Sequence, residues 1–200
     1  MVSVRINDLK DYATINHVPI MQDEGINYIL DYIKTNNVKN ILEIGSAIGY
    51  SAIRFASVDD DIFVTTIERD DNMYNEAIKN INAFNLNNRI NIIHGDALNT
   101  DINGKYDLIF IDAAKSQYIK FFSKYKNNLN DNGIIITDNL SFHGLVEDDS
   151  KIKNRNTRQL VKKIRNYIDF LHNNDEFDTI FLSIGDGISI SKFKDKSCNN

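Results

Sequence analysis

The sequence predicts an α/β fold with a single Rossmann-like, doubly wound sheet of seven strands, mostly parallel, with an antiparallel C-terminal strand. Two observations lead to this prediction. Short apolar or β-branched runs alternate with segments whose apolar residues recur at helical spacing, which is typical of parallel strands joined by helices. The last two strand-like segments instead follow one another through Gly185, Asp186 and Gly187, which predicts a hairpin and therefore an antiparallel last strand.

Each element is predicted from its own pattern. Residues 24–33 carry apolar side chains every three or four positions, which predicts a helix, whereas 106–112 and 133–137 are nearly continuous apolar runs, as in central strands covered on both faces. The expected strands are 38–44, 62–67, 90–94, 106–112, 133–137, 177–184 and 188–193. The expected helices are 24–33, 50–56, 73–84, 118–129 and 157–171.

Length and composition fit one globular domain. The chain has 200 residues, 42% of them hydrophobic and 26% charged, so we expect a domain over residues 1–194 and a frayed tail over 195–200. No apolar run approaches the roughly 18 residues that cross a bilayer, and the start lacks a signal-peptide pattern, so no membrane partner is expected. The single cysteine, Cys198, fits a reducing compartment, and we expect a cytoplasmic protein. The oligomeric state stays open, with a homodimer as one alternative.

A glycine-bearing turn follows the first expected strand, in the sequence EIGSAIG of residues 43–49. Such turns let a ligand approach the backbone. A dinucleotide fingerprint starting at Gly45 requires glycine at 47 and glycine or alanine at 50, where this chain has Ala47 and Tyr50. The phosphate-binding Gly-Lys-Ser/Thr loop is absent too, so NAD, FAD and ATP are disfavoured. Glu68 ends the next strand, where a carboxylate can accept both ribose hydroxyls; the alternative is a merely structural tight turn.

Oxygen-bearing side chains end two consecutive strands. Asp112 ends YDLIFID, and Asp138 and Asn139 end GIIITDN. Because the carboxyl ends of parallel strands border the ligand crevice, we expect these three side chains to lie close together. Two carboxylates and an amide oxygen suit Mg²⁺, with Mn²⁺ or Ca²⁺ as alternatives. An aspartate at a strand end also forms turns and helix caps, and that alternative stays open.

Several motifs together resemble one enzyme family. LEIGSAIGYS, TIERD, GDA, FIDAAKSQY, TDN and the GDG hairpin, over about residues 12–194, resemble the S-adenosylmethionine-dependent methyltransferases. The resemblance is to the small metal-dependent O-methyltransferases of the catechol and caffeoyl-CoA type, and is greatest to the bacterial tRNA 5-hydroxyuridine methyltransferases. It implies S-adenosylmethionine as cofactor and Mg²⁺ held by Asp112, Asp138 and Asn139. The implied cofactor-binding residues are Met21, Glu43, Gly45, Ser51, Glu68, Gly95, Asp96, Ala97 and Asp112.

The resemblance also gives individual roles. Ser51 would hold the cofactor carboxylate, and Met21 would cover the cofactor, although Met21 is equally explained as a core residue. The lysine that matches Lys115 is the general base of the family, and a nearby dication would favour its neutral amine; the alternative is a solvated surface lysine. The implied reaction moves a methyl group from a sulfonium to a hydroxyl that has a second oxygen beside it.

Two acceptor classes have such vicinal oxygens, namely small catechols or phenols and 5-hydroxyuridine in RNA. Residues 151–165 hold seven Lys or Arg and no acidic residue, which indicates a phosphate-binding surface in a chain of net charge −5. A solvated helix face is the alternative. We therefore expect tRNA as the first partner, with methylation of wobble 5-hydroxyuridine to 5-methoxyuridine, and a small phenol as the second; a non-catalytic binding protein is a remote third. The candidate RNA-binding residues are Arg155, Arg158, Lys162 and Lys163.

Overall fold

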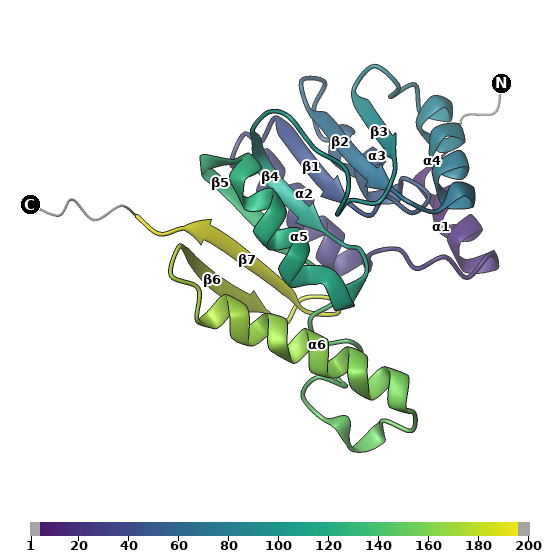
Figure 1. Ribbon diagram of the computed structural model, residues 1–200. Coiled ribbons are helices and arrows are strands. Elements are labelled where there is room, and N and C mark those ends of the chain that lie inside the picture. The colour runs from purple at the N-terminus through teal and green to yellow at the C-terminus, as the bar shows by residue number, and fades with distance from the viewer. Residues whose placement is uncertain (1–4, 196–200) are drawn as a thin grey trace, which may run out of the picture.

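The computed structural model describes residues 5–195 and contains one seven-stranded α/β sheet of order β3-β2-β1-β4-β5-β7-β6 (Figure 1). β1 to β5 are mutually parallel, and β7 runs antiparallel to both β5 and β6. The predicted fold class is thereby confirmed. The strands are β1 (Asn40–Ile44), β2 (Phe63–Glu68), β3 (Ile90–His94), β4 (Tyr106–Ile111), β5 (Leu129–Thr137), β6 (Phe177–Leu182) and β7 (Ile188–Phe193).

Helices cover both faces of the sheet, with α5 and α6 in front of it and α2 behind it in Figure 1. The α-helices are α1 (Ile6–Ile15), α2 (Asp23–Thr35), α3 (Tyr50–Ala56), α4 (Asp71–Ala83), α5 (Tyr118–Tyr125) and α6 (Arg155–His172). Short 3₁₀ turns are η1 (Lys115–Gln117), η2 (Lys126–Asn128) and η3 (Asp149–Lys151). No helix in the described range is long and apolar enough to cross a membrane.

The strand pleat explains why the central strands are apolar along their whole length. Side chains alternate between the two faces, so Ile41 packs in the core beneath α1 to α4 while Leu42 packs in the core beneath α5 and α6. Leu108 and Ile109 of β4 divide in the same way. Both faces are dry, and polar side chains are therefore left for the strand ends, where the ligand crevice of such sheets lies.

Several predicted boundaries were wrong, and polar residues account for most of them. The strand expected at 133–137 begins at Leu129, because the polar segment 130–132 continues the strand without an apolar signal. The helix expected to reach residue 129 ends at Tyr125 and continues only as η2. The α1 helix was not predicted, since it buries only Leu9 and Ala13. The tail from residue 196 and Cys198 lie outside the described residues.

Candidate active site

A cavity of about 270 Å³ opens at the carboxyl ends of the parallel strands. It lies where the strand order reverses between β1 and β4, which is the usual ligand crevice of a doubly wound sheet. Its walls come from the segment before α2 and from the loops that follow the first five strands. The lining residues are Pro19, Ile20, Met21, Ile44, Gly45, Ser46, Ala47, Tyr50, Ser51, Ile67, Glu68, Arg69, Gly95, Asp96, Ala97, Asp112, Ala113, Ala114, Lys115, Phe121 and Asn139.

The glycine turn after β1 forms one wall by close backbone packing. Gly45 has φ +96°, and a Cβ there would lie 2.4 Å from the carbonyl oxygen of Asp112, so the position excludes any other residue. Ser46 is buried in the same wall, and its Oγ has no hydrogen-bond partner among the described residues. A backbone cradle with an unpartnered buried hydroxyl is suited to a polar ligand that completes it.

Glu68 fixes this turn from the end of β2. Its Oε2 accepts the backbone N–H of Ala47 at 2.8 Å, and its Oε1 accepts those of Arg69 and Asp70, each at 2.8 Å. Ala47 has φ +44°, a conformation that an alanine rarely adopts, so the carboxylate holds a strained backbone in place. A carboxylate has about four acceptor sites, which leaves capacity for a ligand hydroxyl.

Glu43 lies behind the cavity wall and does not line the cavity. It is fully buried, and its carboxylate accepts hydrogen bonds from the hydroxyls of Ser51 and Thr66. Burial raises the pKa of Glu43 to about 7, and the two hydroxyls oppose that rise only in part. Ser51 does line the cavity, but its hydroxyl is directed to Glu43. Of its two hydrogen-bond partners, only Ser51 links Glu43 to the cavity lining.

Asp112, Asp138 and Asn139 meet at the ends of β4 and β5. The Nδ2 of Asn139 donates to Oδ2 of Asp138 at 2.7 Å and to Oδ1 of Asp112 at 3.4 Å. Asn139 has φ +65°, which asparagine tolerates better than most residues, and this turns its amide toward the two carboxylates. Asp112 and Asn139 line the cavity, whereas Asp138 lies behind them and is 3% exposed.

The electrostatics of this cluster suit a cation. Burial, and for Asp138 the neighbouring charge of Asp112, raise the pKa of both carboxyls, that of Asp138 to about 7. Among the described residues no three His, Cys, Asp or Glu form a metal site, so the third ligand available here is an amide oxygen. A flip of the Asn139 amide directs its oxygen to the carboxylates without moving the backbone. Two buried carboxylates with an amide oxygen fit a hard divalent cation.

Lys115 begins η1 and lines the cavity beside this cluster. Its positive charge lowers the pKa of Asp112 and Asp138, against the effect of burial. Its Nζ lies 5.7 Å from the centroid of the Phe142 ring. Sequence reasoning missed Phe142, and only its position three residues after Asn139 could have suggested it.

The predicted residues divide by where the structure puts them. Met21 both lines the cavity and belongs to the core, with 5% exposure, and its role in covering the cofactor stays a prediction. The predicted residues that line the cavity are Met21, Gly45, Ser51, Glu68, Gly95, Asp96, Ala97, Asp112, Lys115 and Asn139. Those that do not are Glu43, Asp138, Arg155, Arg158, Lys162 and Lys163.

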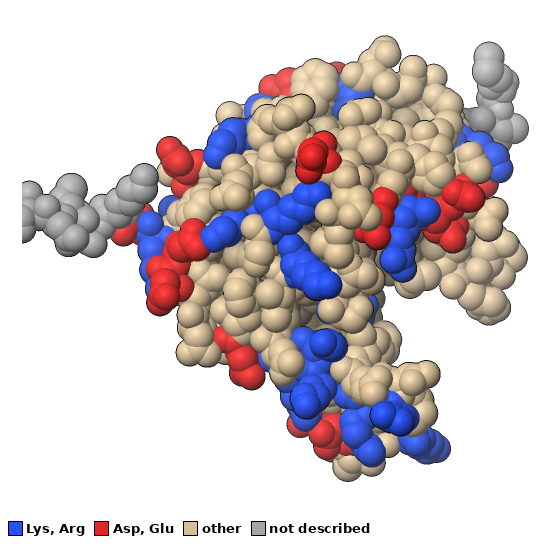
Figure 2. Space-filling view, viewed as in Figure 1, with Lys and Arg blue, Asp and Glu red and all other residues tan. Residues whose placement is uncertain are grey.

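The basic residues gather around the start of α6, at the lower end of the molecule in Figure 2. Part of this charge serves the local structure. Arg165 pairs with Asp149 at 2.8 Å and donates to the carbonyl oxygen of Val146, and Arg158 donates to that of Ile152 at 3.3 Å. α6 contacts η1, so the surface lies on the Lys115 side of the fold.

Comparison with known proteins identifies relatives over the whole described fold. A sequence model of an O-methyltransferase family matches residues 3–194. A caffeoyl-CoA O-methyltransferase of Populus kitakamiensis is 28% identical over 193 residues, covering 92% of this chain and 81% of the relative. A solved structure described as a "putative caffeoyl-CoA O-methyltransferase from Staphylococcus aureus" is 45% identical, with TM-score 0.91 and coverage of 96% and 93%. An SAH-bound methyltransferase of Podospora anserina is 26% identical, with TM-score 0.79 and coverage of 86% and 78%.

Proposed function

Because the chain belongs to the O-methyltransferase family matched over residues 3–194 and is a S-adenosylmethionine-dependent enzyme, we propose that it methylates a small phenolic acceptor with two adjacent oxygens. From the sequence alone we placed tRNA first. Two of the relatives reported above are named for caffeoyl-CoA and none of them for tRNA, so the small phenol takes first place here.

The observation that carries the proposal is the convergence of Asp112, Asp138 and Asn139 at one wall of the cavity, with Lys115 on the same wall. These three residues would hold a divalent cation, which supplies Lewis acidity and a template for two neighbouring acceptor oxygens. An acceptor with a single hydroxyl satisfies only half of such a template. The donor set therefore favours a vicinal diol over an isolated phenol.

The other residues of the cavity suit the cofactor, whose sulfonium supplies an electrophilic methyl group. Glu68 would accept a ribose hydroxyl, since three backbone N–H groups occupy three of its roughly four acceptor sites. The glycine turn and Ser51 would hold the methionine part, and Asp96 and Ala97 would lie beside the adenine. We propose Lys115 as the group that accepts the acceptor's proton at Nζ, because it lies on the cavity wall next to the cation-binding cluster.

The test compares catechol with resorcinol, whose hydroxyls are not adjacent. Purified protein is incubated with S-adenosylmethionine and Mg²⁺, and methylated products are identified by mass spectrometry. We expect methylation of catechol, loss of it in excess EDTA, and recovery on addition of Mg²⁺. Equal rates on the two diols, or full activity after verified metal removal, would contradict the proposal.

A second candidate is methylation of 5-hydroxyuridine in tRNA, and the basic surface is the observation that favours it. Arg155, Lys162 and Lys163 are exposed residues in the first half of α6 and have no acidic partner among the ion pairs of the described residues. If RNA is the acceptor, replacing all three by Gln should raise KM for tRNA and reduce the log–log salt slope by about 0.7 per lost single-strand phosphate contact. Methylation of catechol should be unchanged. Wild-type kinetics of this variant on tRNA would remove the second candidate's support.

A further inference from the structure

The turn between β6 and β7 contains a buried carboxylate that serves no residue of its own turn. Asp186 is 7% exposed, and its Oδ1 accepts the backbone N–H of His143, 43 positions earlier, at 2.5 Å. Its Oδ2 is buried without a hydrogen-bond partner among the described residues. An aspartate that only forms a turn bonds to N–H groups one to three positions ahead. Asp186 therefore acts on another segment of the chain.

That segment is the loop directly after the proposed cation ligands. Besides His143, its Leu140 N–H donates to the carbonyl oxygen of Gly187 at 2.9 Å, and its Ser141 N–H donates to that of Asp186 at 2.8 Å. Gly187 makes this contact possible, because a Cβ there would lie 2.9 Å from the Ser141 nitrogen. The hairpin turn and the loop are thus joined by three hydrogen bonds, donated by the N–H groups of Leu140, Ser141 and His143.

The loop needs such support because its backbone is unfavourable. Phe142 has φ +48° and His143 has φ +59°, a left-handed conformation that non-glycine residues seldom adopt in succession. Backbone of this kind persists only where surrounding contacts over-determine it. The bond from His143 N–H to the buried Asp186 is the contact made at the centre of the strained run. Without this hydrogen bond, we expect the backbone of Phe142 and His143 to leave the left-handed conformation.

The same turn also contacts the opposite wall of the cavity. The N–H of Gly185 donates to Oε2 of Glu24 at 3.1 Å, and Glu24 stands at the start of α2, just after the lining residue Met21. On the other side, the supported loop holds Phe142 near Lys115. The turn is therefore connected both to the part of the cavity wall that contains Met21 and to the part that contains Lys115.

From these contacts we propose that Asp186 is a positioning residue, whose carboxylate fixes the backbone of residues 139–144 and thereby sets Asn139 and Phe142 relative to Lys115. Its catalytic consequence rests on the proposed function, whereas its effect on the loop does not. The carboxylate does not itself touch the cavity, since Asp186 is not a lining residue.

The first experiment measures amide hydrogen–deuterium exchange in the loop, using the protein without added ligand. Asp186→Ala should raise amide exchange over residues 139–146 at least about 10-fold, while β1 to β3 keep their protection. Asp186→Asn should stay close to wild type, because its amide oxygen can still accept the His143 N–H. Should the alanine variant not fold, Asp186→Ser replaces it, since its hydroxyl is too short to reach. Unchanged exchange in the loop would overturn the proposal whatever the enzyme's substrate.

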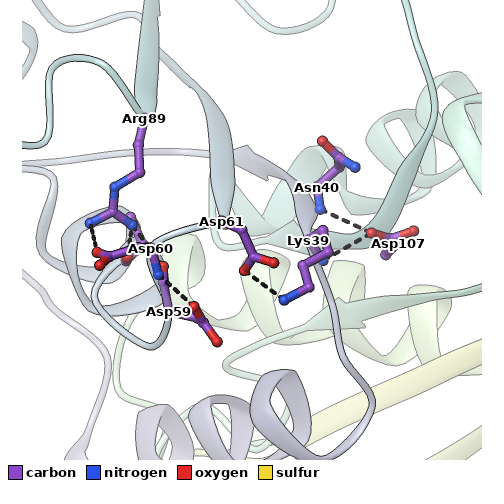
Figure 3. Close-up of polar contacts among 8 residues, drawn as sticks. Lys39, Asn40, Asp59, Asp60, Asp61, Arg89 and Asp107 are labelled. Atoms are coloured by element: carbon purple, nitrogen blue, oxygen red, sulfur yellow. Dashed lines mark hydrogen bonds and ion pairs between the residues drawn. The ribbon is translucent and has the colours of Figure 1, made fainter.

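A matched control is available at the far end of the sheet, where the carboxylate of Asp107 accepts the backbone N–H groups of Lys39 and Asn40 (Figure 3). Asp107→Ala removes a similar carboxylate-to-backbone contact remote from the cavity. It should lower stability without changing exchange in 139–146 or kcat. If Asp107→Ala and Asp186→Ala raise loop exchange equally, the effect is general destabilisation and the proposal is wrong.

The second experiment uses catalysis and a rescue. With catechol as acceptor, Asp186→Ala should lower kcat about 10- to 100-fold, as expected for displaced reacting groups, with the Kd for S-adenosylmethionine changed less than about 2-fold. Adding His143→Gly should restore part of kcat, because glycine adopts the left-handed backbone without strain. A kcat equal to wild type in Asp186→Ala, or no gain from the glycine, would overturn the positioning role. If wild type is inactive on every diol while loop exchange still responds, only the proposed function fails.

Discussion

The two ends of the central strands use acidic residues in opposite ways. At the amino ends, acidic side chains have matched partners: Asp107 accepts two backbone N–H groups, Asp61 pairs with Lys39 at 2.5 Å, and Asp60 lies 3.3 Å from Arg89 (Figure 3). The hydrogen bond from Lys39 lowers the pKa of Asp61. Each of these three carboxylates therefore has at least one donor or cation as its partner.

At the carboxyl ends, the same residue types are buried together with little compensating charge. Burial raises the pKa of Glu43, Asp112 and Asp138. For the two aspartates, Lys115 supplies the opposing positive charge, and for Asp138 a backbone hydrogen bond from Asn139 also lowers the pKa. Such an arrangement is unfavourable for the empty protein and favourable once a cation or a polar ligand is bound. The difference teaches that residue type alone does not mark a site, whereas buried, uncompensated charge at strand ends does.

The largest expected effect on methyl transfer comes from removing one carboxylate at each end of the strands and comparing activity with stability. Asp138→Asn should abolish methyl transfer, because it removes a proposed cation ligand, yet stability at pH 8 should be equal or greater, because a buried charge is removed. Asp107→Ala should do the reverse, with a loss of about 1–3 kcal/mol in the free energy of unfolding and kcat within about 2-fold of wild type. Catechol assays and chemical denaturation check both. Retained turnover in Asp138→Asn would break the comparison.

The second comparison is between Lys115, at the carboxyl ends of the strands, and Lys39, at the amino ends. Lys115→Met should lower kcat by about 10²–10⁴-fold, the usual range for a general base, and Lys115→Arg should not rescue it because arginine stays protonated. Lys39→Met, at the amino end, removes an exposed ion pair and should change stability by less than about 1 kcal/mol and kcat not at all. Rate measurements on the three variants decide this. Rescue by arginine would make Lys115 a positioning charge instead of a base.

The third comparison concerns how the free energy of unfolding changes with pH, and at the carboxyl ends it depends on Glu43. Its pKa is about 7 in the folded protein against 4.5 for an ordinary glutamate, so the unfolded chain releases this proton first as pH rises. Glu43→Gln and wild type should show the same pH trend below about pH 4.5. Between about pH 4.5 and 7 wild type should lose roughly 3 kcal/mol relative to the variant, and above that the difference should be constant.

Denaturation in guanidinium at pH 5, 6, 7 and 8 measures this difference directly. A difference between Glu43→Gln and wild type that does not change with pH would mean that the carboxyl has an ordinary pKa. The amino-end acid Asp61 has its pKa lowered, so its contribution has the opposite sign and is confined to acidic pH. The difference between Asp61→Asn and wild type should therefore stay constant from pH 5 to 8, which makes this variant the control for the Glu43 effect.

Local pattern predicted the sheet but only part of the site. The strands were predictable because both of their faces are covered, so they are apolar at every position, as at Ile41 and Leu42. Asp112 and Asn139 could be predicted as site residues because they are polar and directly follow those apolar runs. The cofactor-binding role expected for Glu43 stays a prediction; the structure places this residue inside β1, with its side chain buried against Ser51 and outside the cavity lining.

The remainder depends on contacts that no local pattern records. The bond from Asp186 to His143 joins positions 43 residues apart, and the left-handed backbone of Phe142 has no sequence signal, since neither glycine nor asparagine marks it. α1 has few buried apolar residues, and Ile15 within it is 76% exposed, so its helical period is weak. These features are fixed by tertiary packing, which overrides local propensity.

Glu68 shares one feature with the carboxylates at the amino ends and another with those at the cavity, and its replacement gives the smallest predicted effect. Like Asp107, it holds backbone N–H groups, those of Ala47, Arg69 and Asp70; unlike Asp107, it lines the cavity. If it also accepts a ribose hydroxyl, Glu68→Ala should weaken S-adenosylmethionine binding by about 1.5–3 kcal/mol, or roughly 10- to 150-fold in Kd. Calorimetry with S-adenosylmethionine measures this.

Part of such a loss could come from loosening of the segment around Glu68, and the neighbouring Asp70 isolates that part. Asp70 caps α4 by accepting the N–H groups of Asn72 and Met73, and it does not line the cavity. Asp70→Ala should therefore lower stability by about 1 kcal/mol and leave the Kd for S-adenosylmethionine unchanged. A selective loss of affinity in Glu68→Ala then measures the ligand contact itself, because both variants release backbone donors in the same segment. Equal affinity in the two variants would assign Glu68 to the structural class, with Asp107, and leave the cavity without its proposed ribose acceptor.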